Sequence, residues 1–167
     1  RRIRAGIEAI DDLYILGHPD SNLVALASDT VSVFHVADEM RQKGWFVQPQ
    51  LGFNGSKANI HLSVNPASLR WVDDLLTDLA ACCAIARDNP PEGLAPAVIE
   101  SLQGLDPDAI TPQMFNELLA MAGLDGVGVP DRMAMINQLL DAMPPRFTEV
   151  MLQEFLNQLY IPPSDGP

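Results

Sequence analysis

The stretch ANIHLSV, residues Ala58–Val64, decides the fold of the first half of the chain. Its apolar and polar residues alternate strictly, which predicts a β-strand with one face toward a core and the other away from it. The polar side carries Asn59, His61 and Ser63. A polar strand face usually turns to water, so His61 is either a solvated side chain or part of a face that looks onto a binding site.

Three further segments complete a small sheet of about four strands. Leu13–Gly17 and Leu23–Ser28 flank the turn-rich residues HPDSN and predict two short strands. Trp45–Gln48 predicts a third strand, and the glycine-containing segment Leu51–Lys57 predicts the hairpin loop that leads into ANIHLSV. We expect an antiparallel or mixed sheet.

Helical patterns alternate with these strands. An amphipathic helix opens the chain, Ser32 is placed to cap a second helix, and Gly44 to end it. Asn65 and Pro66 predict the cap and first turn of a third helix. The order helix, strand, strand, helix, strand, strand, helix indicates an α+β fold with helices on one face of the sheet, and it leaves the other face without a cover.

The second half of the chain is punctuated by prolines. Apolar stripes over Met133–Met143 and Phe147–Leu159 predict two helices, and Thr111 before Pro112 predicts the start of another. The glycines in Asp125–Pro130 have no strand before them and no lysine after them, so they predict a loop. We expect an α+β small domain over residues 1–88 and an acidic helical extension over residues 89–167.

The net charge of −12 is concentrated in the second half of the chain. Residues 1–87 carry 8 Lys and Arg against 10 Asp and Glu, or −2, whereas residues 88–167 carry 2 against 12, or −10. Such a surface disfavours nucleic acid and anionic membranes as partners. No apolar run approaches the length of about 20 residues that a membrane span needs. We expect a soluble cytoplasmic protein.

The residues that could do chemistry are few. No strong catalytic or metal-binding pattern is present, and the adjacent Cys82 and Cys83 suit neither a structural disulfide nor a metal site. Lys43 and Lys57 lie at a helix end and in a hairpin, where we expect exposed, charged amines. Since the chain also begins inside a helical pattern at Arg1, we expect it to be the carboxy-terminal part of a longer protein.

Several segments in order resemble a known family. They are LYILGHPDSNLVALAS (13–28), VFHVADEMRQKGW (33–45), ANIHLSV (58–64) and FLNQLY (155–160). They resemble the carboxy-terminal small domain of pyridoxal-phosphate-dependent enzymes of the aspartate aminotransferase fold. The resemblance is to the group II decarboxylase branch and, within it, to the sphingosine-1-phosphate lyase family. It covers residues 1–88 and about 145–160.

The resemblance implies where the chemistry lies. In this family the pyridoxal 5'-phosphate and its Schiff-base lysine belong to a large domain that precedes the small one, and the enzymes are generally homodimers. The strand position of His61 carries an arginine in the related amino-acid decarboxylases, and in glutamate decarboxylase that arginine meets the substrate carboxylate. A histidine there implies a substrate without this carboxylate. His61 is therefore our candidate substrate-binding residue, with no catalytic, cofactor-binding or metal-binding residue in the chain itself.

The reaction implied by the resemblance is cleavage of a phosphorylated sphingoid base to phosphoethanolamine and a fatty aldehyde. Two alternatives stay open. One is a pyridoxal-phosphate-dependent amino-acid decarboxylase of the same branch, and the other is a non-catalytic α+β interaction module.

Overall fold

The computed structural model describes residues 1–90 and 131–160, together with isolated positions between them (100, 104, 106, 109, 111, 113, 114 and 117). The chain forms two compact units. The first comprises Arg1–Gly93 and Arg132–Gln138, and the second comprises Leu94–Asp131 and Leu139–Pro167. The domain boundary expected between residues 88 and 89 stays a prediction.

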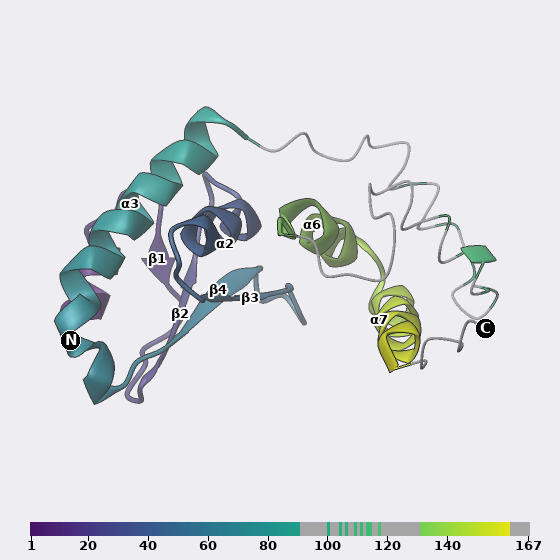
Figure 1. Ribbon diagram of the computed structural model, residues 1–167, viewed down its shortest axis with the longest axis horizontal. Helices are drawn as coiled ribbons and strands as arrows, with labels where there is room; N and C mark the ends of the chain where they lie inside the picture. Colours follow the sequence, from purple (N-terminus) through teal and green to yellow (C-terminus); the bar gives the residue numbers. More distant parts are fainter. Residues whose placement is uncertain are drawn as a thin grey trace, which may run out of the picture. The chain divides into compact units, whose positions relative to one another are not determined.

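The first unit is built on a four-stranded sheet (Figure 1). Its strands are β1 (Tyr14–Ile15), β2 (Leu23–Ala27), β3 (Gln48–Gln50) and β4 (Asn59–Ser63). They lie in the order β1-β2-β4-β3, and every neighbouring pair is antiparallel. The strand of ANIHLSV is thus an inner strand that joins the two hairpins, and the expected α+β fold with four strands is confirmed.

The third strand lies further along the chain than predicted. The prediction was Trp45–Gln48, but pairing with β4 begins at Gln48. Trp45 is instead packed against the core, and its Nε1 donates a hydrogen bond to Asp78 Oδ2 at 2.8 Å. Pro49 is tolerated because β3 is an edge strand, where one missing N–H need not interrupt a ladder.

Four helical segments accompany the sheet (Figure 1). They are α1 (Arg2–Glu8), α2 (Val33–Gln42), the 3₁₀ helix η1 (Pro66–Trp71) and α3 (Val72–Asp88). Because η1 runs directly into α3, the third predicted helix begins with a tighter turn than an α-helix has.

The predicted helix ends are mostly confirmed. The Ser32 side chain accepts a hydrogen bond from His35 N at 3.4 Å, so it caps α2 as expected. Gly44 has a φ of 86°, the left-handed conformation that commonly ends a helix. Asn65 occupies the N-cap position of η1, but its side chain makes no capping hydrogen bond. The backbone N–H of Ser68 bonds to the Asn65 carbonyl instead.

Helices α1, α2 and α3 share one core with one face of the sheet. The sheet contributes Val24 and Leu26 from β2 and Ile60 and Leu62 from β4, all of them buried. The helices contribute Ile3, Ile7, Val33, Phe34, Val36, Ala37, Met40, Val72, Leu79 and Ala86. The alternation in ANIHLSV predicted that the apolar face of this strand points toward a core, and the structure confirms it.

Cys82 and Cys83 are both fully buried in α3, and neither forms a disulfide. Burial raises the pKa of the Cys82 thiol to about 11 and that of Cys83 to about 12. Both thiols are therefore held in the protonated, unreactive form at neutral pH.

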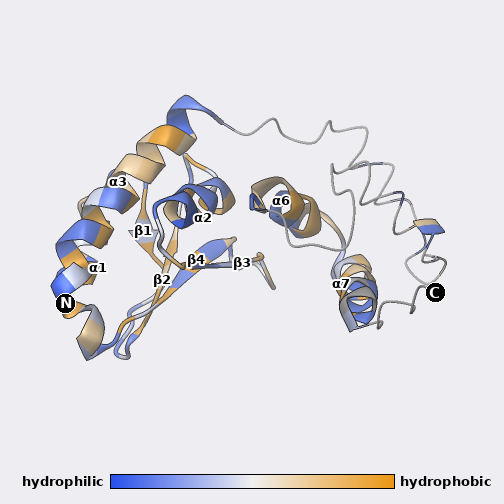
Figure 2. Ribbon diagram, in the orientation of Figure 1, coloured by the Kyte–Doolittle hydropathy of each residue, from blue (hydrophilic) through white to orange (hydrophobic). Residues whose placement is uncertain are grey.

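Two further helices follow, α6 (Ala134–Ala142) and α7 (Pro145–Tyr160), as the apolar stripes predicted. Figure 2 shows hydrophobic and hydrophilic residues alternating around α7. Phe147 and Met151 are buried on its apolar side. The predicted cap at Thr111 is supported by a 3.2 Å hydrogen bond from Met114 N to its hydroxyl, whereas the predicted loop Asp125–Pro130 lies outside the described residues.

The first turn of α6 belongs to the first unit and is held there by α2. The two carboxylate oxygens of Asp38 accept hydrogen bonds from Met133 N at 2.9 Å and Ala134 N at 2.8 Å. Asp38 is buried, so α2 supplies an anionic cap to the α6 amino terminus. In the parts of the chain that the structure describes, no helix is long and apolar enough to cross a membrane.

Candidate functional site on the polar face of the sheet

His61 lies at the centre of the sheet face that points away from α1, α2 and α3. It occupies the middle of β4 and pairs with Ala25 on β2 and with Gln48 on β3. Directly opposed residues share a face, so these three side chains form one row across the sheet. His61 is half-buried, and among the described residues its imidazole has no hydrogen-bond or ion-pair partner. Both ring nitrogens are thus open to a ligand or to a further part of the protein.

A polar cluster borders this face where β4 begins and β2 ends. The Tyr14 hydroxyl donates to Asp29 Oδ1 at 3.2 Å, and Lys57 forms an ion pair with the same carboxylate. The Lys57 amine also lies 6.0 Å from the centre of the Tyr14 ring. Hydrogen bonding to Lys57 lowers the pKa of Asp29, and the reciprocal bond raises the pKa of Lys57. Tyr14 pairs with Ala27 and so shares the face of His61.

Asn59 adds a buried acceptor to the same face, two residues before His61. Its Nδ2 donates to the Lys57 carbonyl at 2.9 Å. Its Oδ1 is buried and has no hydrogen-bond partner among the described residues. A buried acceptor without a hydrogen-bond donor costs about 1–3 kcal/mol, so this oxygen lowers the stability of the described part of the chain.

Neither lysine is suited to form a Schiff base. The Lys43 amine donates to Asp78 Oδ1 at 2.9 Å, and this hydrogen bond raises the pKa of Lys43. Lys57 is held in the same way by Asp29. A Schiff-base lysine needs a lowered pKa, so the prediction of ordinary charged lysines agrees with the structure.

The other two histidines lie elsewhere. His18 is exposed in the turn before Pro19. His35 is buried on α2, where its Nε2 lies 3.3 Å from Glu39 Oε1, and Glu39 also pairs with Arg132. The sequence analysis identified neither partner: Glu39 lies four residues after His35 on the same helix, a spacing that could have indicated it, whereas Arg132 lies 93 residues from Glu39. No group of His, Cys, Asp and Glu able to hold a metal ion occurs among the residues described.

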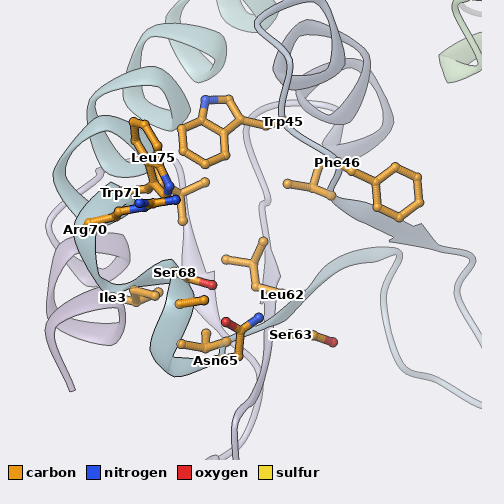
Figure 3. Close-up of a pocket in the computed structure, with 13 residues that line it drawn as sticks. Ile3, Trp45, Phe46, Leu62, Ser63, Asn65, Ser68, Arg70, Trp71 and Leu75 are labelled. Carbon is orange, nitrogen blue, oxygen red and sulfur yellow. The ribbon is translucent and has the colours of Figure 1, made fainter.

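A separate hollow of about 340 Å³ lies at the other end of β4 (Figure 3). We call it the tryptophan pocket; it is lined by Ile3, Trp45, Phe46, Val47, Leu62, Ser63, Val64, Asn65, Ala67, Ser68, Arg70, Trp71 and Leu75. In Figure 3, Arg70 and Trp71 lie together on one side, with Trp45 above and Asn65 and Ser68 below. No local pattern in the sequence indicates this pocket, since its walls come from segments that only the fold brings together.

Comparisons with known proteins agree on one group of enzymes. Residues 96–158 match the family model described as the C-terminal putative HTH domain of pyridoxal-dependent enzymes. Sphingosine-1-phosphate lyase of Arabidopsis thaliana is 34% identical over 122 residues, and that of Oryza sativa subsp. japonica is 32% identical over 120 residues. The chain is similar in sequence to these sphingosine-1-phosphate lyases. The expected family resemblance is thereby confirmed.

The two plant sphingosine-1-phosphate lyases are each matched over 71% of this chain and 21% of their own length. The chain thus spans about a fifth of the length of these relatives. Sphingosine-1-phosphate lyase of Drosophila melanogaster is 27% identical over 92 residues, covering 54% of this chain and 16% of the relative. A solved sphingosine-1-phosphate lyase from Burkholderia pseudomallei K96243 is 28% identical, with a TM-score of 0.45, over 52% of this chain and 19% of that chain.

Proposed function

We propose that the chain is the carboxy-terminal part of a pyridoxal-phosphate-dependent carbon–carbon lyase that cleaves a phosphorylated sphingoid base to phosphoethanolamine and a fatty aldehyde. The observation that carries the proposal is the similarity to sphingosine-1-phosphate lyases from two plants and an insect. The match of residues 96–158 to a domain of pyridoxal-dependent enzymes also supports it, because it includes residues 96–144, which the residue-level resemblance left out.

The part of the reaction assigned to this chain is substrate binding by the polar sheet face. His61 stands at the centre of that face with both imidazole nitrogens unengaged among the described residues, so it can donate to or accept from a substrate hydroxyl. A histidine lacks the two-pronged guanidinium fork with which an arginine binds a carboxylate. This choice of residue supports a substrate without a carboxylate, and so favours the lyase over an amino-acid decarboxylase.

The cofactor is held by a part of the protein outside this chain in our proposal. Lys43 and Lys57 are both bonded to carboxylates that raise their pKa values, which does not fit the amine that carries pyridoxal phosphate. When bound, the cofactor supplies an electron sink for the bond that breaks. This chain's own contribution is to orient the substrate with His61.

Assembly and location are further parts of the proposal. The polar sheet face, opposite the helical core, is assigned to the cofactor-binding domain of the same protein, within a homodimer. The half-buried His61 supports a covering partner there, since its imidazole has no hydrogen-bond partner among the described residues. Two buried free thiols are typical of a reducing compartment, which supports the cytoplasm.

The test uses the full-length protein that contains this chain. Reconstituted with pyridoxal phosphate, it should acquire visible absorbance and release a long-chain aldehyde from a phosphorylated sphingoid base. A colourless protein that leaves the sphingoid base intact would overturn the proposal. Release of carbon dioxide from an amino acid would replace the lyase by a decarboxylase.

His61→Ala in the full-length protein should lower kcat/KM at least tenfold, because it removes a group proposed to bond the substrate. The melting temperature should stay within a few degrees, since the side chain is outside the core. His18→Ala is the matched control, being exposed in a turn, and should leave kcat/KM unchanged. Equal kinetics for both variants would remove His61 from the site.

A further inference from the structure

We propose that Asn54 is a site of spontaneous covalent modification, where the chain converts its own asparagine to aspartate and isoaspartate with release of ammonia. The feature that carries the proposal is the dipeptide Asn54–Gly55, which lies in the loop between β3 and β4. The inference does not rest on the proposed lyase function, because it uses only the sequence and the geometry of this loop.

The dipeptide forms the tip of a tight hairpin turn. Phe53 and Ser56 exchange both of their backbone hydrogen bonds, from Phe53 N to Ser56 O at 3.0 Å and from Ser56 N to Phe53 O at 2.9 Å. The two residues between them have positive φ values, 48° for Asn54 and 80° for Gly55. Asn followed by Gly is the sequence that best suits such a two-residue turn. Both residues are exposed, so water and hydroxide can reach them.

The two groups that react are adjacent and free. The backbone nitrogen of Gly55 is the nucleophile, and the side-chain Cγ of Asn54 is the electrophile. Among the described residues, neither the Gly55 N–H nor the Asn54 amide has a hydrogen-bond partner. Gly55 also has no side chain to crowd the attacking nitrogen. The turn is held by two hydrogen bonds at the surface, so the local opening that ring closure requires has a low free-energy cost.

The reaction needs only water. The Gly55 nitrogen loses its proton to hydroxide and forms a bond to the Asn54 Cγ, while the bond from Cγ to the side-chain nitrogen breaks. Ammonia leaves with a proton taken from water, and a cyclic imide remains. Water then adds to one of the two imide carbonyls. Breaking the new bond to Cγ gives aspartate, whereas breaking the original peptide bond gives isoaspartate, in which the backbone runs through the former side chain.

Asn22 provides an internal control. It is also exposed in a turn-rich segment, but the residue after it is Leu23, whose N–H donates to the Ser21 hydroxyl oxygen at 3.2 Å. A branched side chain and an engaged N–H both hinder ring closure, so Asn22 should stay intact. Asn54 is the only asparagine in the sequence that is followed by glycine.

The conversion should open the hairpin turn. Isoaspartate lengthens the backbone by one methylene group between Phe53 and Ser56, so the paired hydrogen bonds of the two-residue turn can no longer form. Hydrogen exchange at the Ser56 amide should therefore quicken in the converted chain, while exchange in β4 stays the same. Asn54→Asp adds the same charge on a normal backbone and should keep the turn, because Asp followed by Gly also suits it.

The experiment uses the 167-residue chain, kept in warm, mildly alkaline buffer and sampled over several weeks. Digestion with trypsin releases residues 44–57, which contain Asn54 as their only asparagine, and residues 5–41, which contain Asn22 as theirs. We expect the mass increase of an amide-to-acid conversion in residues 44–57 and none in residues 5–41. An isoaspartyl methyltransferase should methylate the converted peptide. The rate should rise with pH, because the attacking nitrogen must lose its proton.

A variant and a peptide make the test decisive. Gly55→Asp should slow the conversion about tenfold, because a side chain then crowds the attacking nitrogen. A Cβ at this position meets open space, and aspartate adopts positive φ more readily than most residues, so the variant should fold, as circular dichroism can verify. A synthetic peptide of residues 44–57 gives the rate without the turn.

Three results would overturn the proposal. The first is that Asn54 stays intact in the folded chain after the peptide has converted, which would show that the turn protects it. The second is equal conversion of Asn22 and Asn54 in the same sample. The third is an unchanged conversion rate in Gly55→Asp. Unaltered hydrogen exchange at the Ser56 amide of the converted chain would contradict the opening of the turn.

Discussion

At the scale of single residues, the contact between Asp12 and Arg87 shows how the fold holds a buried charge. Asp12 is 7% exposed, and it accepts hydrogen bonds from Arg87 and, at 2.8 Å, from the Thr30 hydroxyl. The hydrogen bond from Arg87 lowers the pKa of Asp12, against the raising effect of burial. Because the pKa of Asp12 is lower in the folded state than in the unfolded state, the ionised carboxylate stabilises the protein at pH values above the ordinary carboxyl pKa. This stabilisation is lost as the pH falls through the pKa of Asp12 in the folded state.

Arg87→Gln should therefore destabilise the chain at neutral pH by about 1–2 kcal/mol, because it leaves the Asp12 carboxylate buried with only part of its bonding. The loss should shrink toward acid, where Asp12 is protonated in both states, and acid unfolding should begin at a higher pH than in the parent. Urea unfolding at a series of pH values measures both effects. Arg4→Gln, which breaks only the exposed pair with Glu8, should change stability by less than about 0.5 kcal/mol.

At the scale of elements, the cap that α2 gives to α6 is a contact between segments far apart in the sequence. Asp38 accepts the backbone N–H groups of Met133 and Ala134, and the Gln138 side chain donates to the Ser32 hydroxyl at 2.9 Å. Ser32 thus serves two helices, as the cap of α2 and as a partner of α6. These bonds explain why Arg132–Gln138 belong to the first compact unit.

Asp38→Asn should weaken this attachment by about 1–2 kcal/mol, since an amide has one acceptor oxygen where the carboxylate has two, and the charge at the helix amino terminus is lost. The effect should be local. Hydrogen exchange at the amides of Met133 and Ala134 should quicken, while exchange in β4 stays the same. Asp74→Asn, an exposed change on α3, serves as the control; unchanged exchange at both amides in Asp38→Asn would contradict the capping role.

The elements also show which features the sequence could reveal. The strand β4, the Ser32 cap and the Gly44 helix end follow from local alternation and backbone preference, and they were predicted correctly. The position of β3 was wrong because tertiary contacts of Trp45 outweighed the strand preference of an aromatic run. The placement of His61 on the sheet face opposite the core was predictable from the periodicity of the strand alone. Its neighbours across the sheet, the Lys57–Asp29 pair and the tryptophan pocket depend on pairing over long sequence separations, which no local pattern contains.

At the scale of the whole molecule, charge decides what the matched segment 96–158 can bind. The description of its family mentions a helix-turn-helix, a fold often found on DNA. Residues 96–158, however, carry nine Asp and Glu against two Arg, or −7. Both arginines are already paired with carboxylates, Arg132 with Glu39 and Arg146 with Glu149.

We therefore expect no binding of duplex DNA by the chain. Fluorescence anisotropy of a labelled duplex should stay flat up to about 100 μM protein even at low salt, since non-specific binding depends on cations that contact phosphates. A basic DNA-binding domain in the same assay provides the positive control. A salt-sensitive rise in anisotropy with this chain would show that local structure overcomes its net charge.

The position of Cys82 and Cys83 has a practical consequence for studying the two units. These are the only thiols of the chain, and both lie in the core of the first unit. A thiol reagent can modify them only when that core opens, whereas opening of the second unit exposes no cysteine to the reagent. The labelling rate in native buffer thus reports the free energy of opening of the first unit by itself. Heat or urea unfolding of the whole chain would instead report the stabilities of both units together.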